Sequence, residues 1–354
     1  MSELTGPVAV IGTGLLGTSV ALACRRAGIE VLLADASSDH VRTASGLGAG
    51  RPIEPGDRPQ LVVVAVPPAD LGTVIARALD EHPDAVVTDV GSVKGLPLAA
   101  VAEHPGASRY VGSHPMAGSE RSGPLAASPA LFDGRPWAVT PGSGARADAV
   151  ELVEALAGLC GAVALRMTPD EHDRAVARTS HMPHLMAALV AGRLAEAPSS
   201  QLALSGQGVR DVTRVAAGDP SLYSQIVTGN ADALVALLSE VRGELDLLIG
   251  ALQGNDRDAV SGLLRHGVAG TRAIPGKHGG PAVPTTSVFV LVPDEPGGLA
   301  RLFADAGESG VNIEDVHIDH EPARRVGVVE LVVAEPAEDQ LTTALEARGW
   351  ALHR

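Results

Sequence analysis

A glycine-rich turn near the N-terminus constrains the fold of this chain more than any other feature. The turn at 12–17 (GTGLLG) follows the short apolar segment 8–11 and precedes an alanine- and leucine-rich helical pattern that runs to Ala27. In this strand–turn–helix context, glycines let backbone N–H groups approach a pyrophosphate at the N-terminus of a helix. The sequence therefore predicts a dinucleotide-binding domain of the Rossmann type.

An acidic residue after the next strand predicts which dinucleotide binds. Asp35 stands at the end of the predicted strand 30–33, shortly after the glycine-rich turn. Its carboxylate would accept hydrogen bonds from the adenine ribose hydroxyls and would repel a 2′-phosphate, which favours NAD over NADP as the cofactor. The predicted cofactor-binding residues are Gly12, Thr13, Gly14, Leu15, Gly17 and Asp35.

Apolar periodicity divides the chain into three regions. Strand patterns alternate with helical patterns over 1–150, which predicts a doubly wound parallel sheet, although 46–60 shows no regular element. Helical patterns replace strands over 151–270, and a Pro- and Gly-rich linker follows at 271–285. Residues 286–354 have the order strand–helix–strand–strand–helix–strand, which is typical of a ferredoxin-like domain. We therefore expect an α/β protein with a Rossmann-type domain, an all-helical domain and a ferredoxin-like domain.

Composition excludes several classes of partner. The net charge of -15 argues against a nucleic-acid partner, and the longest apolar run, 61–66, is too short to span a membrane. Two cysteines, Cys24 and Cys160, cannot form a disulfide framework, which indicates a reducing compartment. The N-terminus has neither a basic region nor a long apolar run, so no signal peptide is expected. We expect a cytoplasmic protein that binds neither nucleic acid nor membrane.

One histidine is the first candidate for catalysis. His114 lies in the Gly- and Pro-punctuated segment 111–120, which we expect to be a loop that faces the nicotinamide. A histidine titrates near neutrality, so it can take a proton from a hydroxyl as hydride leaves the same carbon. The segment therefore predicts the oxidation of an alcohol, although a loop histidine taken alone is more often structural.

A second segment, 89–95 (DVGSVKG), closes a predicted strand, where ligands bind in such sheets. Ser92 could hydrogen-bond His114 or a substrate hydroxyl. Lys94 is one of two lysines in a chain that otherwise uses arginine. Its side chain could hold a substrate carboxylate or simply fix the loop.

Two further groups come from the helical region. His181 and His184 share one face at the start of a long predicted helix, and either a metal pair, substrate contacts or core packing would explain them. No third ligand has suitable spacing, so no metal is predicted. Arg210 and Arg214 lie on one predicted helix. Two such arginines usually mark a solvated face, but one of them is the natural fork for a substrate carboxylate.

Five blocks in order resemble the prephenate dehydrogenase family, which comprises prephenate, arogenate and cyclohexadienyl dehydrogenases. The blocks lie at 12–17, 89–95, 112–120, 180–184 and 211–223, and the resemblance covers nearly the whole chain. It implies the NAD-dependent oxidative decarboxylation of prephenate to 4-hydroxyphenylpyruvate. It also implies that the helical region is the substrate and dimerisation domain of an intertwined homodimer.

The resemblance assigns roles to individual residues. It implies that His114 hydrogen-bonds the ring 4-hydroxyl, that Ser92 orients this group and that Arg214 holds the ring carboxylate. The remaining candidate substrate-binding residues are His184, Ser180, His181, Glu120 and Lys94, with Glu120 placed near the entrance to the site.

The C-terminal region resembles an ACT domain, through DEPGGL at 294–299 and GVNIEDVHI at 310–318. The resemblance implies a regulatory domain that binds an aromatic amino acid, with tyrosine as the first candidate. Asp294 and Gly297 would contact this effector in one turn, and Asn312 would reach it from the same or a partner subunit. A dimerisation module without a ligand is the alternative.

Two rival functions remain open at this level. Arogenate and 4-amino-4-deoxyprephenate are related substrates that one sequence does not distinguish from prephenate. A non-catalytic sensor of amino acids would keep the nucleotide fold, but it would be free to lose His114, Ser92 and Arg214, and all three are present.

Overall fold

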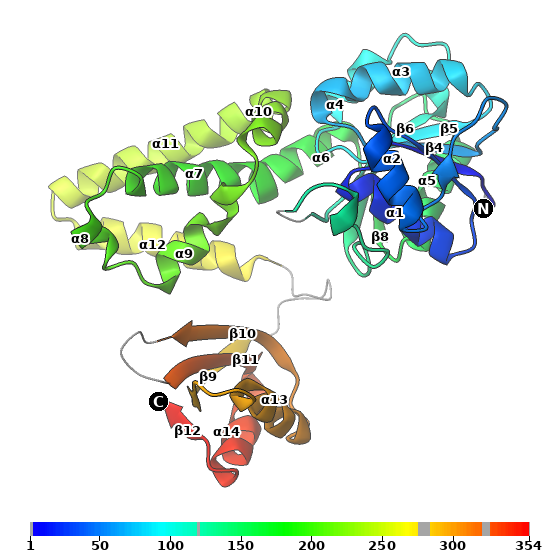
Figure 1. Ribbon diagram of the computed structural model, residues 1–354. Coiled ribbons are helices and arrows are strands. Elements are labelled where there is room, and N and C mark those ends of the chain that lie inside the picture. Colours follow the sequence, from blue (N-terminus) through cyan, green and yellow to red (C-terminus); the bar gives the residue numbers. More distant parts are fainter. Residues whose placement is uncertain (1–2, 119–120, 275–283, 321–325, 354) are drawn as a thin grey trace. The chain divides into compact units, whose positions relative to one another are not determined.

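A mixed sheet of eight strands organises the N-terminal part of the protein (Figure 1). The computed structural model describes residues 3–118, 121–274, 284–320 and 326–353. The strands lie in the order β3-β2-β1-β4-β5-β6-β7-β8. Their bounds are Val8–Ile11 (β1), Val31–Ala34 (β2), Arg51–Pro52 (β3), Leu61–Val64 (β4), Val86–Asp89 (β5), Tyr110–Pro115 (β6), Pro136–Pro141 (β7) and Val163–Arg166 (β8).

Alternate residues of each central strand belong to opposite cores, as the twofold period of a strand requires. In β1, Val8 and Val10 belong to the core that helices α1, α2 and α5 cover. Ala9 and Ile11 belong to the core on the other face, which α3 covers. The helices of this region are Leu15–Arg26 (α1), Ser38–Gly46 (α2), Leu71–Glu81 (α3), Gly95–Ala100 (α4) and Ala147–Leu159 (α5).

The structure corrects the prediction of an all-parallel sheet that ends near residue 150. Strand β7 pairs antiparallel with β6, and β8 continues the sheet beyond the predicted boundary. The boundary at 150 falls inside α5, whose buried residues pack on the sheet. Strand β8 is four residues long and largely exposed, so its sequence shows no buried apolar run. Part of the segment 46–60 forms β3, a two-residue edge strand.

Helices follow the sheet, in agreement with the sequence. They are Pro169–Val176 (α6), Met182–Leu194 (α7), Ser199–Leu202 (α8), Gln207–Thr213 (α9), Pro220–Gly229 (α10), Ala231–Gln253 (α11) and Arg257–Arg272 (α12). A π-helical segment, Ala177–His181 (η4), joins α6 to α7, and His181 is its last residue. Such wide turns occur often at functional sites.

The chain divides into two compact units, residues 1–246 and 247–354, so the division falls within α11. The second unit contains a four-stranded antiparallel sheet in the order β10-β11-β9-β12. Its elements are Thr285–Pro293 (β9), Gly298–Glu308 (α13), Ile313–His320 (β10), Val326–Ala334 (β11), Glu338–Ala347 (α14) and Ala351–His353 (β12). This is the predicted βαββαβ order, and both helices share one core with the sheet. Most of the predicted linker 271–285 lies outside the described residues.

Short 3-10 turns complete the described elements. They are Pro68–Asp70 (η1), Ala107–Arg109 (η2), Pro124–Ala126 (η3), Arg214–Ala217 (η5) and Glu335–Ala337 (η6). Within the residues that the structure describes, none of the helices combines the length and the apolar character needed to cross a bilayer.

Candidate active site

His114 lies on a strand rather than in the predicted loop. It is the fifth residue of β6, where it is paired with Ala138 of the antiparallel strand β7. Glycine and proline in this segment suggested a loop, but both are tolerated here near the end of a strand. The strand holds the imidazole at the carboxyl end of the parallel part of the sheet, where ligands bind in open α/β sheets.

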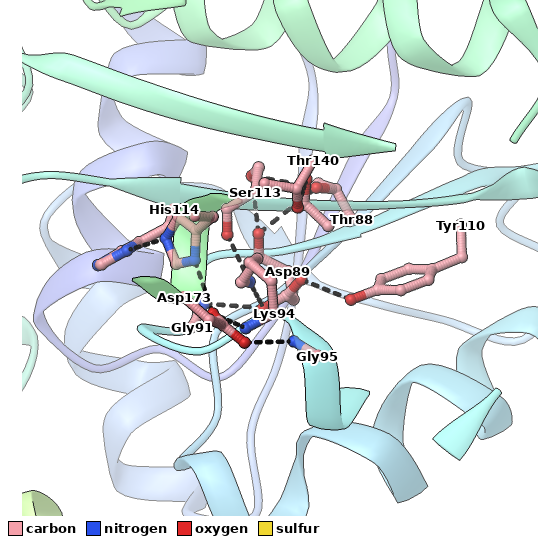
Figure 2. A network of polar contacts seen from close by, with 12 residues as sticks. Thr88, Asp89, Gly91, Lys94, Gly95, Tyr110, Ser113, His114, Thr140 and Asp173 are labelled. Carbon is pink, nitrogen blue, oxygen red and sulfur yellow. Dashed lines mark hydrogen bonds and ion pairs between the residues drawn. The ribbon is translucent and has the colours of Figure 1, made fainter. Parts of the chain in front are cut away.

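A buried polar cluster fixes the end of β6 (Figure 2). The Lys94 ammonium forms an ion pair with Asp89 and donates to the backbone carbonyl of Ser113 at 2.7 Å. The Tyr110 hydroxyl donates to the other oxygen of Asp89 at 2.8 Å. The Ser113 hydroxyl donates to the Asp89 carbonyl at 2.7 Å. These bonds join β5, the loop after it and β6 into one unit around His114.

The cluster overturns the expectation that Lys94 contacts a substrate. The side chains of Lys94 and Asp89 are both fully buried. Burial lowers the pKa of Lys94, and the carboxylate of Asp89 opposes this shift. Lys94 therefore fixes the loop, which was the other interpretation of the sequence, because its buried ammonium binds Asp89 and the carbonyl of Ser113.

Two residues that the sequence analysis missed extend from His114 into α6. His114 Nδ1 lies 2.9 Å from Nε2 of His172, and His172 Nδ1 lies 2.8 Å from Oδ1 of Asp173. His172 is 1% exposed. A signal for it did exist, because His172 occupies the buried face of α6 one turn before Val176, where an apolar residue is usual.

The carboxylate of Asp173 also holds the loop after β5. It accepts hydrogen bonds from the backbone N–H groups of Lys94 at 2.9 Å and Gly95 at 2.8 Å. Burial raises the pKa of Asp173, but the bonds from His172, Gly95 and Lys94 together bring it below its ordinary value. Asp173 is therefore ionised at neutral pH.

The surroundings of His114 keep its imidazole neutral. Desolvation lowers the pKa of His114 well below 6.5, and the positive charges of His172, Lys94 and His181 would lower it further. A neutral imidazole is the form that accepts a proton, so this histidine is suited to act as a general base.

The structure brings other candidates to the same region. His181 is 2% exposed, and its Nδ1 accepts from the side-chain amide of Asn230 at 3.2 Å. Burial lowers the pKa of His181 to about 4. The ring of His184 is buried and stacks on Tyr223 at 3.4 Å between centroids. This packing supports the non-metal readings of the His181 and His184 pair.

The remaining candidates differ in exposure. Ser180 lies half-buried on the π-helical segment, and Ser92 lies half-buried in the loop between β5 and α4. No hydrogen bond joins Ser92 and His114, which are both described, and Nδ1 of His114 is bonded to His172. Arg214 is exposed at the start of η5. Glu120 lies outside the described residues.

The glycine-rich turn has the shape that a dinucleotide needs. A Cβ on Gly17 would lie 1.9 Å from the carbonyl oxygen of Gly12, so the turn closes tightly only with glycine there. A Cβ on Gly14 would meet nothing within 4 Å, which leaves open space above the turn. The first turn of α1 carries no acidic residue that would repel a pyrophosphate. Leu15 begins this helix.

Asp35 is directed at the same turn. Its carboxylate accepts from the backbone N–H of Thr13 at 2.5 Å and from that of Ser37 at 2.8 Å. Burial raises the pKa of Asp35, but the bonds from Ser37 and Thr13 bring it below its ordinary value. The ionised carboxylate therefore lies beside the glycine-rich turn.

Comparisons with known proteins agree with this geometry. The family model "Prephenate dehydrogenase, nucleotide-binding domain" matches residues 20–166, and "Prephenate dehydrogenase, dimerization domain" matches 168–266. The first match ends at the last residue of β8, which agrees with the extended sheet. Within the described residues, no group of three or more His, Cys, Asp or Glu side chains is arranged to hold a metal ion.

Relatives match over most of the chain. The Streptomyces niveus protein "Probable prephenate dehydrogenase NovF" is 34% identical over 96% of this chain and 98% of its own. Prephenate dehydrogenase from A. aeolicus, solved with hydroxyphenyl propionate and NAD+, is 26% identical with a TM-score of 0.68, over 75% of this chain and 96% of its own. Synechocystis arogenate dehydrogenase is 25% identical with a TM-score of 0.63, over 75% and 98%. The chain therefore belongs to the prephenate dehydrogenase family of NAD-dependent oxidoreductases.

Proposed function

We propose that the protein oxidises prephenate with NAD and releases CO₂ and 4-hydroxyphenylpyruvate. The observation that carries the proposal is a neutral histidine held on β6 at the carboxyl end of the parallel strands. The glycine-rich turn shaped for a dinucleotide follows β1 of the same sheet. NAD, when bound, accepts the hydride from the ring carbon that carries the hydroxyl. His114 takes the hydroxyl proton, and loss of CO₂ then makes the ring aromatic.

The protein mainly has to position and polarise, because aromatisation drives the reaction. We assign the ring hydroxyl to His114 and Ser92, and the ring carboxylate to Arg214. Ser180 and His184 line the substrate pocket in this proposal. Their half-buried or buried positions on η4 and α7 suit side chains that shape a pocket.

The direct test is to incubate the purified protein with NAD and prephenate, and in parallel with arogenate and 4-amino-4-deoxyprephenate. We expect NADH and CO₂ in equal amounts, fastest with prephenate. A faster reaction with arogenate would make arogenate the substrate. This alternative is specific because one structural relative is an arogenate dehydrogenase. No NADH with any of the three would contradict the proposal and favour a sensor without catalysis.

Arg214 offers a sharper test of how the substrate is held. Arg214→Ala should raise KM for prephenate strongly and leave the affinity for NAD unchanged. Arg214→Lys should not restore KM, because an ammonium lacks the two-pronged geometry that a carboxylate prefers. Arg210→Ala is the matched control, since Arg210 lies one turn earlier and is also exposed. Equal effects at both positions would mean that Arg214 belongs to a solvated face.

We also propose that residues 286–354 form a regulatory ACT domain that binds tyrosine. The βαββαβ order supports this, and so does the turn after β9, where Gly297 has a φ of +90° that other residues rarely adopt. Asp294 is exposed in the same turn. Calorimetric titration of tyrosine and phenylalanine into the full chain and into a chain that ends at Arg272 tests the proposal. Equal binding to both chains would place the ligand elsewhere.

The strand register limits how Asn312 takes part. Asn312 precedes Ile313, which pairs through β11 with the start of β9, whereas the Asp294–Gly297 turn follows the end of β9. Seven residues of strand separate the two levels, which corresponds to about 20 Å. Within one chain, Asn312 therefore cannot share a small ligand with this turn. Only the alternative in which a partner subunit supplies Asn312 remains in the proposal.

The proposed assembly is a homodimer, and the proposed location is the cytoplasm. The family model that matches 168–266 describes a dimerization domain. The helices and turns of this region expose large apolar side chains that a second copy would cover, among them Leu189, Leu204, Val235 and Leu264. Both cysteines are buried as free thiols, which suits a reducing compartment.

A further inference from the structure

The hydrogen bonds that run from His114 through His172 to Asp173 have a direction. Asp173 is ionised, and a carboxylate only accepts, so Nδ1 of His172 must carry the proton of that bond. A neutral imidazole has one donor nitrogen and one acceptor nitrogen. In the uncharged form of His172, Nε2 is therefore an acceptor, and the proton between the two rings belongs to Nδ1 of His114.

We propose that His172 and Asp173 are positioning residues that hold His114 in the tautomer whose bare Nε2 accepts the substrate's hydroxyl proton. The inference rests on the proposed function for the reaction itself. In that step the O–H bond breaks and an N–H bond forms at Nε2 of His114. The electron pair left on oxygen forms the carbonyl as hydride passes to NAD.

The charges around His114 show why an anion behind it matters. Lys94 faces it from the loop after β5, His172 from α6 and His181 from η4. Each of these groups, when it is itself protonated, opposes a positive charge on His114. Once His114 is protonated, its Nδ1–H is directed at His172, and the carboxylate of Asp173 lies on the far side of that ring. Asp173 therefore stabilises the imidazolium through His172 and offsets part of this repulsion.

The burial of His172 shows that it positions His114 and does not itself touch the substrate. His172 is 1% exposed, and both ring nitrogens are occupied by His114 and Asp173. Asp173 is tied to the backbone of Lys94 and Gly95, while its own carbonyl accepts from the side-chain amide of Asn230 at 2.7 Å. The loop after β5 and the helical region are therefore both joined to Asp173, the first at its carboxylate and the second at its backbone carbonyl, which fixes His172 in place.

The first test is Asp173→Asn. Asp173→Asn removes the anion, and either orientation of the amide sets its N–H₂ against a backbone N–H, that of Lys94 or that of Gly95. The bond that fixes the proton on Nδ1 of His172 is therefore weakened, and with it the tautomer of His114. We expect kcat to fall about 100-fold or more, with KM for prephenate and NAD nearly unchanged. The acid limb of the kcat profile should move to lower pH, because an anion that stabilised the imidazolium is gone. Asp170→Asn is the matched control, since Asp170 is exposed on the same helix.

A pair of variants at His172 separates hydrogen bonding from packing. In His172→Gln, the amide can donate to Asp173 and accept from His114, so the tautomer is kept and much of the activity should remain. In His172→Phe, the ring volume is kept but both bonds are lost, and kcat should fall as in Asp173→Asn. Equal activity in the two variants would overturn the proposal.

Nitrogen-15 NMR of histidine-labelled protein tests the tautomer without catalysis. In the unaltered protein, His114 should show a protonated Nδ1 and a bare Nε2, and Asp173→Asn should weaken this preference. A bare Nδ1 in the unaltered protein would contradict the inference, whatever the substrate proves to be. If the NMR result holds and no substrate is oxidised, the proposed function fails and the tautomer assignment stands. Loss of NAD binding together with kcat in Asp173→Asn would show a purely structural role.

Discussion

At the scale of the residue, His114 has to be uncharged when the substrate binds, because only a neutral imidazole accepts the hydroxyl proton. Its pKa lies well below 6.5 because the ring is desolvated. At pH 6.5, half of the molecules of an ordinary histidine are protonated and cannot act as a base. Here kcat/KM should stay constant as the pH falls through 6.5 and decline only below that value. A decline centred at 6.5 or above in the measured profile would contradict this assignment.

Substitution of the same residue should separate binding from chemistry. His114→Asn keeps a hydrogen-bonding side chain but has no basic nitrogen. We expect the affinity for NAD to stay the same and kcat to fall by about two to four decades, the usual contribution of a general base. Fluorescence titration with NADH and steady-state rates would measure both. Near-normal turnover would show that another group takes the proton.

The preference for NAD depends on a second single residue. Asp35→Ser removes both the ribose contact and the charge that repels a 2′-phosphate, so NAD should bind more weakly and NADP more tightly. The ratio of kcat/KM for the two cofactors measures the change. Asp39→Ser is a control, because Asp39 lies on the same loop-and-helix segment and is exposed. An unaltered protein that already prefers NADP would contradict the assignment.

At the scale of the element, the loop between β5 and α4 is held by a buried ion pair. Lys94→Met leaves the charge of Asp89 buried without its partner, so the free energy of unfolding should fall by about 3–5 kcal/mol. Arg166→Met breaks an exposed ion pair with Glu154 and should cost about 1 kcal/mol or less. Urea denaturation of both variants compares them directly. A small effect at Lys94 would mean that Asp89 takes up a proton or finds water instead.

The elements also show what the sequence could predict. Strands β1, β2, β4 and β5 were predictable because each is a short buried apolar run after a turn signal. Strand β7 begins and ends with proline, and β8 is largely exposed, so neither has this pattern. His172 lies 58 positions from His114 in sequence and meets it only because α6 packs near β6. No periodicity encodes such a contact. Lys94 stood out as a rare lysine, but its partner inside the sheet could not be identified.

At the scale of the whole molecule, the catalytic and C-terminal parts have separate cores. The residues matched by the family models end at 266, and the C-terminal sheet packs on its own helices. A chain that ends at Arg272 should therefore still bind NAD and oxidise the substrate at a rate within about threefold of the full chain. Its rate should no longer respond to tyrosine, apart from competition at the active site. Loss of catalysis on truncation would show that the C-terminal sheet supports the active site.

The register of the C-terminal sheet has a thermodynamic consequence. A ligand held by both the Asp294–Gly297 turn and Asn312 has to bridge two copies of the chain, because one copy places these groups about 20 Å apart. Effector binding and self-association would then share one equilibrium, so each would strengthen the other by mass action. The tyrosine concentration needed for half-saturation would fall as the protein concentration rises. A cell that dilutes the enzyme would also desensitise it.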